Sequence, residues 1–398
     1  MLLDALRSVR SRLSDELSLA PAARAERRRD RSRGLSADPG IDATIAATMD
    51  WLARAQDQSI THDGGVARHY SLRTGWSSSY PETTGYIVPT FIALAERTQS
   101  ASMLERARRM LDWLVRIQFP EGGFQGGLVD ALPRVPVTFN TGQILLGLAA
   151  GTAQFGADYA QAMHKAAAWL TETQDSDGCW RRHATPFAAQ GEKAYETHVS
   201  WGLFEAARVA KDPRYADAAL RNVEWALTKQ ATNGWFSDCC LSDPAHPLTH
   251  TIGYVLRGVN EAFSYSRDTK YLDAAQRTAA PLVAAQRPDG SLPGRLASDW
   301  QPAGNWVCLT GTVQIAHCWL QLFKWTGDTR FRDAAFSANR YVRRTVHLTG
   351  ADGVRGGIKG SFPVDAQYGP YEFLNWAAKF FVDSNVLEKD VRDSMHVV

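Results

Sequence analysis

Six amphipathic segments recur along the chain, at residues 41 to 56, 101 to 118, 157 to 174, 212 to 230, 267 to 286 and 327 to 347. Each has one apolar stripe and one charged face, a pattern typical of helices with one side in water. Between them lie segments that are apolar or small nearly all round, at residues 83 to 96, 140 to 153, 196 to 210, 250 to 264, 309 to 324 and 371 to 387. A helix that is apolar on every face is buried on every face, so we expect outer and inner helices to alternate.

A short phrase at the end of the amphipathic segments sets the repeat length. In its clearest copy, Trp169 precedes Gln174, and an Asp/Gly turn at Gly178 returns the chain to Trp180. The glutamine recurs at a constant interval, since 174 − 118 = 56, 230 − 174 = 56 and 286 − 230 = 56. A fixed period of this size indicates one repeated supersecondary unit, which needs its neighbours to cover its apolar faces. We therefore predict an all-α (α/α)6 toroid of six outer and six inner helices over residues 39 to 398.

Residues 1 to 38 have a different character. Nine arginines are interleaved with acids, and Leu2, Leu6, Val9 and Leu13 fall at helical spacing. This pattern predicts a short amphipathic helix followed by a mobile basic linker. We interpret the segment as a solvated tail; the alternative is contact with an acidic membrane surface or a partner protein.

Composition narrows the class of protein. The chain is 44% hydrophobic with a formal charge of +2, which is typical of a globular protein, and it lacks the basic stripe with interleaved aromatics of a nucleic-acid-binding protein. Its five cysteines are an odd number at irregular spacings, which favours reduced thiols. The first twenty residues lack the apolar core of a signal peptide. We therefore expect a cytoplasmic protein that binds no nucleic acid.

The phrase at Gln174, Gly178 and Trp180 resembles the QW repeat of terpenoid cyclase and protein prenyltransferase toroids. The period and the double ring of helices resemble equally the six-hairpin glycosidases and the α/α polysaccharide lyases. The resemblance covers about residues 40 to 390 and implies the toroid architecture. It does not choose among the functions, because the Asp-x-Asp-Asp motif of squalene-hopene cyclases is absent, and Asp238-Cys239-Cys240 matches only part of the prenyltransferase zinc site.

The long loops precede the inner helices, so the first turns of these helices should meet at one rim around the ring axis. Single residues there are often only helix caps, but six helices repeat the pattern, which favours a functional rim. Carboxylates, imidazoles, phenols and amides at one rim are suited to a hydroxyl-rich ligand and to acid/base chemistry. The candidates on the inner helices are Glu82, Tyr86, Asn140, Gln143, Glu196, His198, His250, Tyr254, Gln314 and Asn375.

The loops add aromatic side chains that could stack on sugar rings and cations that could neutralise a carboxylate. These candidates are Arg68, Trp76, Tyr80, Trp180, Trp235, Trp306, Lys359 and Tyr368. His246 and His250 lie near Cys239 and Cys240, and four such ligands can hold zinc, but their spacing matches no strong signature. We expect neither a metal nor another cofactor.

These observations lead to the hypothesis of an enzyme that acts on an oligosaccharide or polysaccharide, which could contain uronic acid. For hydrolysis, Glu82 and Glu196 are the candidate acid and base, and a separation of ~6.5 to 9.5 Å would indicate inversion. For a uronate, His198 or His250 with Tyr254 would abstract a proton in a lyase or epimerase reaction. The alternatives are an enzyme similar to terpenoid cyclases or prenyltransferases, which needs a largely apolar cavity, and a binding protein without catalysis.

Overall fold

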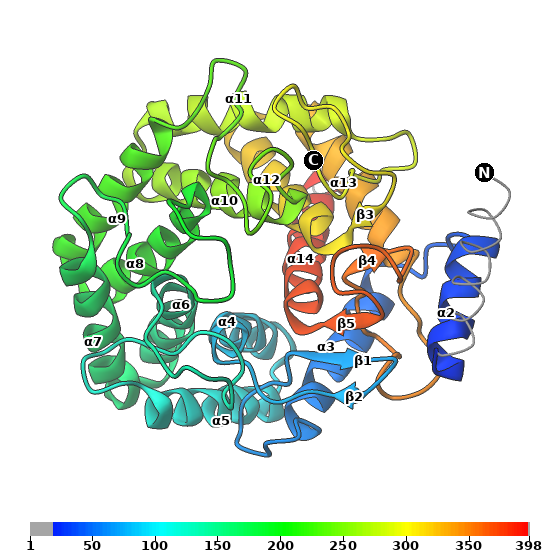
Figure 1. Cartoon of the computed structure of the whole chain (residues 1–398), viewed down its shortest axis with the longest axis horizontal. Coiled ribbons are helices and arrows are strands. Elements are labelled where there is room, and N and C mark those ends of the chain that lie inside the picture. Colours follow the sequence, from blue (N-terminus) through cyan, green and yellow to red (C-terminus); the bar gives the residue numbers. More distant parts are fainter. Residues whose placement is uncertain (1–18, 397–398) are drawn as a thin grey trace, which may run out of the picture.

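The helices form two concentric rings, as a computed structural model that describes residues 19 to 396 shows. The outer ring consists of α3 (Ile41–Asp57), α5 (Ala101–Ile117), α7 (Ala157–Thr173), α9 (Pro213–Leu227), α11 (Thr269–Ala285) and α13 (Thr329–Arg343). The inner ring consists of α4 (Pro81–Thr98), α6 (Thr138–Phe155), α8 (Thr197–Ala210), α10 (Thr249–Ser266), α12 (Leu309–Thr326) and α14 (Asn375–His396). Helix α14 packs against α3, α4 and α12 and closes the ring (Figure 1). The predicted (α/α)6 toroid is confirmed.

The repeated glutamine joins neighbouring outer helices. The Nε2 atom of Gln174 donates to the carbonyl oxygen of Gly178 at 3.1 Å in its own turn, and to that of Ala218 in α9 at 2.9 Å. Gln118 and Gln286 make the corresponding pairs of bonds. Each amide therefore satisfies one carbonyl of its turn and one of the next outer helix, which explains why the phrase recurs with the repeat.

The inner helices approach closely because glycines stand where they touch. A Cβ atom added to Gly147 of α6 would lie 2.3 Å from the carbonyl oxygen of Gly85 in α4. One added to Gly202 of α8 would lie 2.3 Å from the carbonyl oxygen of Gly142 in α6. Both distances are far below van der Waals contact, so only glycine allows this tight inner ring.

Short strands order the loops at the N-terminal ends of the inner helices. Strand β1 (His69–Ser71) pairs antiparallel with β2 (Gly75–Trp76) and with β5 (Glu372–Leu374). Strand β3 (Val307–Cys308) pairs antiparallel with β4 (Ser361–Phe362). The pairing of β1 with β5 joins the loop before α4 to the loop before α14. Parts of the chain about three hundred residues apart therefore meet at one side of the ring axis.

The first described helix, α2 (Pro21–Ser32), packs on the outside of the ring (Figure 1). The Nζ atom of Lys359 lies 2.5 Å from Glu26 Oε1 and 2.6 Å from Asp30 Oδ1, and all three side chains are buried. His347 Nε2 also contacts Glu26 Oε1, at 2.7 Å. The expectation of a mobile basic linker is therefore wrong for residues 21 to 32, because the acids of this segment have buried partners. The predicted helix around Leu2 to Leu13 lies outside the described residues.

Two further observations bear on the class of protein. All five cysteines are buried and unbridged, as the sequence predicts. Within residues 19 to 396, no helix combines the length and the apolar character that crossing a membrane requires.

Candidate functional site

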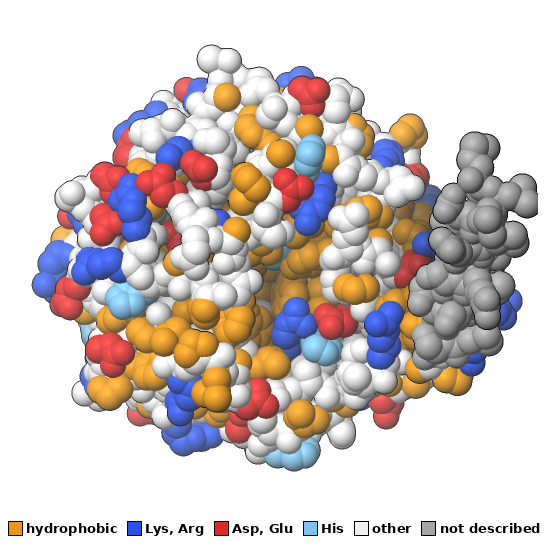
Figure 2. All heavy atoms as spheres, viewed as in Figure 1, with side chains coloured by type: hydrophobic (Ala, Val, Ile, Leu, Met, Phe, Trp, Pro, Cys, Tyr) orange, Lys and Arg blue, Asp and Glu red, His pale blue; other side chains and the backbone are white. Residues whose placement is uncertain are grey.

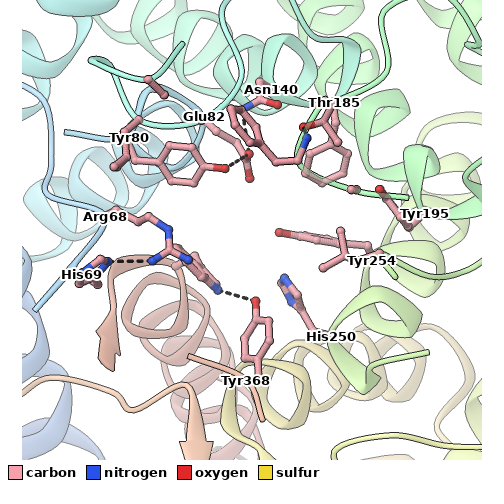
Figure 3. A pocket seen from close by; sticks show the side chains of 18 residues that line it. Arg68, His69, Tyr80, Glu82, Asn140, Thr185, Tyr195, His250, Tyr254 and Tyr368 are labelled. Carbon is pink, nitrogen blue, oxygen red and sulfur yellow. Dashed lines mark hydrogen bonds between the residues drawn. The ribbon is translucent and has the colours of Figure 1, made fainter. Parts of the chain in front are cut away.

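A cavity of about 470 Å³ opens on the ring axis where the inner helices begin. Figure 2 shows this hollow near the centre of the molecule, walled mainly by hydrophobic side chains. Figure 3 shows side chains from opposite sides of the ring pointing into it. The lining includes Arg68, His69, Tyr80, Glu82, Leu128, Phe139, Asn140, Phe187, Tyr195, Leu241, His250, Tyr254, Tyr368 and Trp376.

Glu82 lies in the first turn of α4, directly after Pro81, and is 8% exposed. Its Oε2 atom accepts hydrogen bonds from the hydroxyl of Tyr80 at 2.8 Å and from Nδ2 of Asn140 at 2.9 Å (Figure 3). No side chain among residues 19 to 396 donates to Oε1, which leaves this oxygen for a ligand. Burial raises the pKa of Glu82 to about 7, although the Tyr80 hydrogen bond and the charge of Arg68 oppose the shift. Glu82 can therefore carry a proton near neutral pH.

His250 extends into the same cavity from the first turn of α10 (Figure 3). Its Nδ1 atom lies 2.6 Å from Oε1 of Gln314, a carbonyl oxygen that can only accept a hydrogen bond. Nδ1 therefore carries the proton, and Nε2 presents a lone pair. Burial lowers the pKa of His250 to about 4, although the hydrogen bond to Gln314 opposes the shift. The ring is a neutral base at physiological pH.

Arg68 is the only Lys or Arg among the described side chains that line the cavity. Its Nη1 atom lies 3.1 Å from Oε2 of Glu372 and 2.7 Å from Nδ1 of His69, and its guanidinium carbon lies 4.9 Å from the ring centre of Trp376. Burial lowers the pKa of His69 to about 4, so this imidazole is neutral and accepts the bond from Arg68. Three contacts thus fix one positive charge at the edge of the cavity.

Aromatic rings form most of the remaining wall. Phe139 packs edge-on against Tyr254 with ring centres 5.1 Å apart, and Tyr80 packs against Trp376 at 6.2 Å. The indole nitrogen of Trp376 donates to the hydroxyl of Tyr368 at 2.9 Å. The rim is therefore less polar than the sequence indicated, with a few polar groups held between aromatic faces.

Glu196, the second predicted catalytic carboxylate, does not line the cavity. It ends a short 3-10 helix, η1 (Ala194–Glu196), and the preceding residue, Tyr195, faces the cavity instead. Its Oε2 atom is buried without a hydrogen-bond partner, and burial raises the pKa of this carboxyl to about 8 although Lys193 opposes the shift. The expectation that Glu82 and Glu196 share one hollow is wrong.

His198 also lies outside the lining, below the ring of Tyr254 at a distance of 4.4 Å between ring centres. Its Nδ1 atom contacts Gln143 Oε1 at 2.5 Å, while Nε2 is buried and unpartnered. Burial holds its pKa well below the usual value. The prediction that His198 acts on substrate is not supported by this position.

Several predicted binding residues have structural contacts instead of lining the cavity. Gln143 and Gln314 hold the two histidines, and Asn375 donates to the Ala67 carbonyl and to Thr83. Three aromatic residues pack against other rings: Tyr86 against Phe380, Trp76 against Trp51 and Trp235 against Trp300. The indole nitrogen of Trp180 donates to the Leu170 carbonyl. Lys359 forms an ion pair with Glu26 of α2. Trp306 lines a separate surface pocket beside Arg31. These nine residues were predicted to bind substrate, and their positions contradict that prediction for this cavity.

Phe139, Tyr195 and Trp376 line the cavity without having been predicted, and each is adjacent in sequence to a predicted site residue. At Glu196 and Asn375 the neighbouring residue faces the cavity instead, whereas Asn140 lines it together with Phe139. The possible zinc ligands do not gather: the described residues contain no group of three or more His, Cys, Asp and Glu side chains placed to hold a metal. His246 pairs with Asp243 instead, at 3.2 Å.

Comparisons with known proteins agree with this architecture. The family model for the squalene-hopene cyclase C-terminal domain matches residues 79–258. No curated protein sequence matches the chain significantly.

Solved structures match nearly the whole ring. An unsaturated glucuronyl hydrolase specific for heparin superposes with a TM-score of 0.71 at 14% identity, covering 89% of this chain and 98% of the other. Cellobiose 2-epimerase from Bacillus thermoamylovorans gives 0.67 at 14%, with 87% and 97% covered. A D-mannose isomerase gives 0.70 at 13%, with 88% and 97% covered. The chain therefore has the α/α toroid fold of the six-hairpin glycosidases, which it shares with hydrolases, epimerases and isomerases of sugars.

Proposed function

We propose that the cavity binds a saccharide and that the protein catalyses proton transfer at a carbon next to a carbonyl or carboxylate group. The observation that carries this proposal is the opposite proton affinity of two groups in one hollow. Burial raises the pKa of Glu82 to about 7 and lowers that of His250 to about 4. Near neutral pH one group can donate a proton and the other can accept one, which is the arrangement that acid/base catalysis needs.

In the proposed reaction, Nε2 of His250 takes a proton from the carbon and leaves an enolate or enediolate. Arg68 stabilises the negative oxygen of that intermediate, because it is the cation of the described lining. Oε1 of Glu82 returns a proton to carbon, which gives epimerisation or isomerisation. In a uronate with a leaving group at the β carbon, the proton goes to the departing oxygen instead, and the product is an unsaturated uronate.

The nature of the wall supports a sugar ligand. Aromatic faces such as those of Trp376 and Tyr254 can cover the C–H faces of a pyranose, while Glu82, Asn140 and His250 offer hydrogen bonds to its hydroxyl groups. The three solved toroids described above are also named as saccharide-acting enzymes. Hydrolysis by two carboxylates has less support, since Glu82 is the only acid among the described residues that line the cavity.

The test is solvent isotope exchange. The full chain is incubated in D2O with aldoses, ketoses, disaccharides and uronic-acid oligosaccharides, and deuterium at ring carbons is followed by proton NMR. Ultraviolet absorbance reports unsaturated uronates, and a reducing-end assay reports hydrolysis. We expect exchange that His250→Asn and Glu82→Gln each lower by about 10²-fold or more. His246→Asn is the matched control, because this histidine is exposed and pairs with Asp243 outside the cavity.

Release of reducing ends without isotope exchange would refute proton transfer at carbon and favour hydrolysis. Equal activity of His250→Asn and of the control would remove His250 from the mechanism.

A second candidate function is cyclisation or transfer of an isoprenoid. The specific observation in its favour is the aromatic wall, which includes Phe139, Tyr195 and Phe187, together with the family model that matches residues 79–258. Rings of this kind can stabilise a carbocation, and a protonated Glu82 could start one. Tight binding of an isoprenoid diphosphate, with no exchange on any saccharide, would favour this function over the first.

A further inference from the structure

A second cavity, of about 280 Å³, lies toward the opposite end of the ring axis; we call it the lower cavity. Its lining comes from α4, α8, α10, α12 and α14, and includes Trp201, Arg257, His317, Lys379 and Asp383. On α10, Arg257 follows His250 by seven residues, which corresponds to about 10 Å along a helix. The two cavities have no lining residue in common. The lower cavity is therefore a separate site.

The acceptors in the lower cavity already have donors. Oδ1 of Asp383 accepts from Thr90 at 2.7 Å, and Oδ2 lies 2.6 Å from Lys379 Nζ. At the rim, both oxygens of Asp390 accept from Arg97, at 2.7 and 2.6 Å. Each carboxylate that faces the cavity is thus already paired with a cation of the same cavity.

The donors, in contrast, are in excess. Arg257 uses only Nε, which donates to Glu261 at 2.7 Å, and no acceptor within residues 19 to 396 contacts its two terminal nitrogens. The guanidinium carbon lies 3.8 Å from the ring centre of Trp201, which fixes the plane of the group. Nδ1 of His317 is buried without a partner. A planar guanidinium with both terminal amino groups free is suited to bidentate binding of an oxyanion.

Lys379 adds a buried positive charge to this cluster. Its side chain is 1% exposed, and its Nζ atom lies 5.2 Å from the ring centre of Trp201 and 4.5 Å from that of Phe380. Burial lowers the pKa of this amine, although the charge of Asp383 and its hydrogen bond oppose the shift. Lys379 is paired with Asp383 at 2.6 Å, and its ammonium group has further N–H bonds that can reach a ligand in the cavity.

We propose that the lower cavity binds a compact oxyanion, a carboxylate or a phosphate, through the terminal nitrogens of Arg257, with Lys379 and His317 as further donors. This site is independent of the proposed proton transfer, because none of its residues lines the substrate cavity. Val382, Val386 and Leu387 line the cavity beside the charges, so its wall also offers apolar contacts.

The experiment is isothermal titration of the full chain with sodium phosphate and, separately, with sodium acetate at constant ionic strength. The comparison of the two titrations tells which oxyanion the site prefers. Arg257→Gln removes the bidentate donor, and Ala93→Trp fills the mouth from an exposed position and leaves every charged residue in place. Arg208→Gln removes a charge that is paired with Glu205 outside the lower cavity. Arg68→Gln tests the substrate cavity, which also presents a guanidinium.

The proposal predicts one site per chain with millimolar or tighter affinity for at least one of the two anions. Arg257→Gln and Ala93→Trp should each weaken binding by about tenfold or more, since a bidentate charge-assisted contact is lost or blocked. Arg208→Gln should bind as the unchanged protein does, and Arg68→Gln should keep the binding that Arg257→Gln loses. If Arg257→Gln does not fold, Ala93→Trp alone decides the result. No binding of either anion, full affinity in Ala93→Trp, or loss of binding in Arg68→Gln would each overturn the proposal.

Discussion

The raised pKa of Glu82 predicts a measurable dependence of stability on pH that requires no knowledge of the substrate. The perturbation is Glu82→Gln, which removes the titrating carboxyl and keeps a carbonyl oxygen that can accept from Tyr80 and Asn140. The pKa of this carboxyl is 4.5 in the unfolded chain, its ordinary value, and about 7 in the folded protein. Between these values the folded chain holds a proton that the unfolded chain has lost, so the free energy of unfolding falls as pH rises.

The magnitude follows from that interval. A difference of about 2.5 pKa units between 4.5 and about 7 corresponds to ~3 kcal/mol at ~1.4 kcal/mol per unit. The contribution of Glu82 is therefore fully present below pH 4.5 and is lost as pH rises through 7. For a chain of 398 residues, ~3 kcal/mol corresponds to a change in Tm of about 4 °C. Relative to the unchanged protein, Glu82→Gln should gain this amount between pH 4 and pH 8.

The assay is urea unfolding of both proteins at half-unit steps of pH, with the difference in unfolding free energy plotted against pH. Titrations shared by the two proteins cancel in that difference. Glu26→Gln is a control of opposite sign. Burial raises the pKa of Glu26, but His347 and Lys359 outweigh burial and lower it to about 2. The stability that Glu26 contributes is thus present above pH 4.5 and lost as pH falls toward 2. A difference for Glu82→Gln that stays flat from pH 4 to pH 8 would refute the assignment of a proton-holding Glu82.

Three further predictions concern single contacts. Tyr80→Phe removes a donor to the ionised Glu82, so the pKa of this carboxyl should rise by ~1 to 2 units. The pKa is measured by ¹³C NMR of labelled glutamate, and Glu82→Gln assigns the signal. An unchanged or lower pKa would contradict the role of the hydrogen bond. Lys359→Met leaves two acids of α2 buried without their lysine partner and should lower the free energy of unfolding in urea by ~3 to 5 kcal/mol. A decrease below ~1 kcal/mol would mean that this lysine does not anchor α2. Gly147→Ala brings a methyl group 2.3 Å from the Gly85 carbonyl oxygen and should lower the free energy of unfolding by ~1 to 3 kcal/mol or more, and a neutral result would show that the inner ring is looser than described.

The ring could be predicted from the sequence because its determinants are local and periodic. Gln118, Gln174, Gln230 and Gln286 stand at a constant spacing, and each marks the end of an outer helix. All four donate to a carbonyl of the next outer helix. Gln118, Gln174 and Gln286 also donate to a carbonyl of their own turn, whereas Gln230 donates to the hydroxyl of Thr278. The inner and outer helices could also be told apart in the sequence, because a helix that is buried on all faces has few charged residues.

The site was predicted only in part because helical periodicity does not fix which residue of a first turn faces the axis. One residue of error rotates a side chain by about 100° in a helix with 3.6 residues per turn. Glu82 and His250 do line the cavity, and their roles stay predictions. At α8, however, the short 3-10 helix that ends at Glu196 turns Tyr195 toward the cavity. Irregular turns of this kind leave no periodic signal.

Lys359 illustrates the second limit. A lysine in a long loop beside aromatic residues was a reasonable candidate for binding a carboxylate. It does bind carboxylates, but they belong to Glu26 and Asp30, more than three hundred residues earlier in the chain. No pattern in the sequence connects these positions, since a pairing between distant segments depends on the closed fold.

The same reasoning links ring closure to the assembly of the candidate site. Arg68 precedes β1 near the start of the ring, while Glu372 and Trp376, which hold its guanidinium, lie in β5 and at the start of α14 near its end. The pairing of β1 with β5 therefore completes the cationic edge of the cavity only when the last helix packs against the first repeat. Glu82 and His250 come from single inner helices and do not depend on that pairing in the same way. A partly closed ring would keep the acid and the base but lose the fixed cation, so binding of an anionic group should be the property most sensitive to damage at the closure.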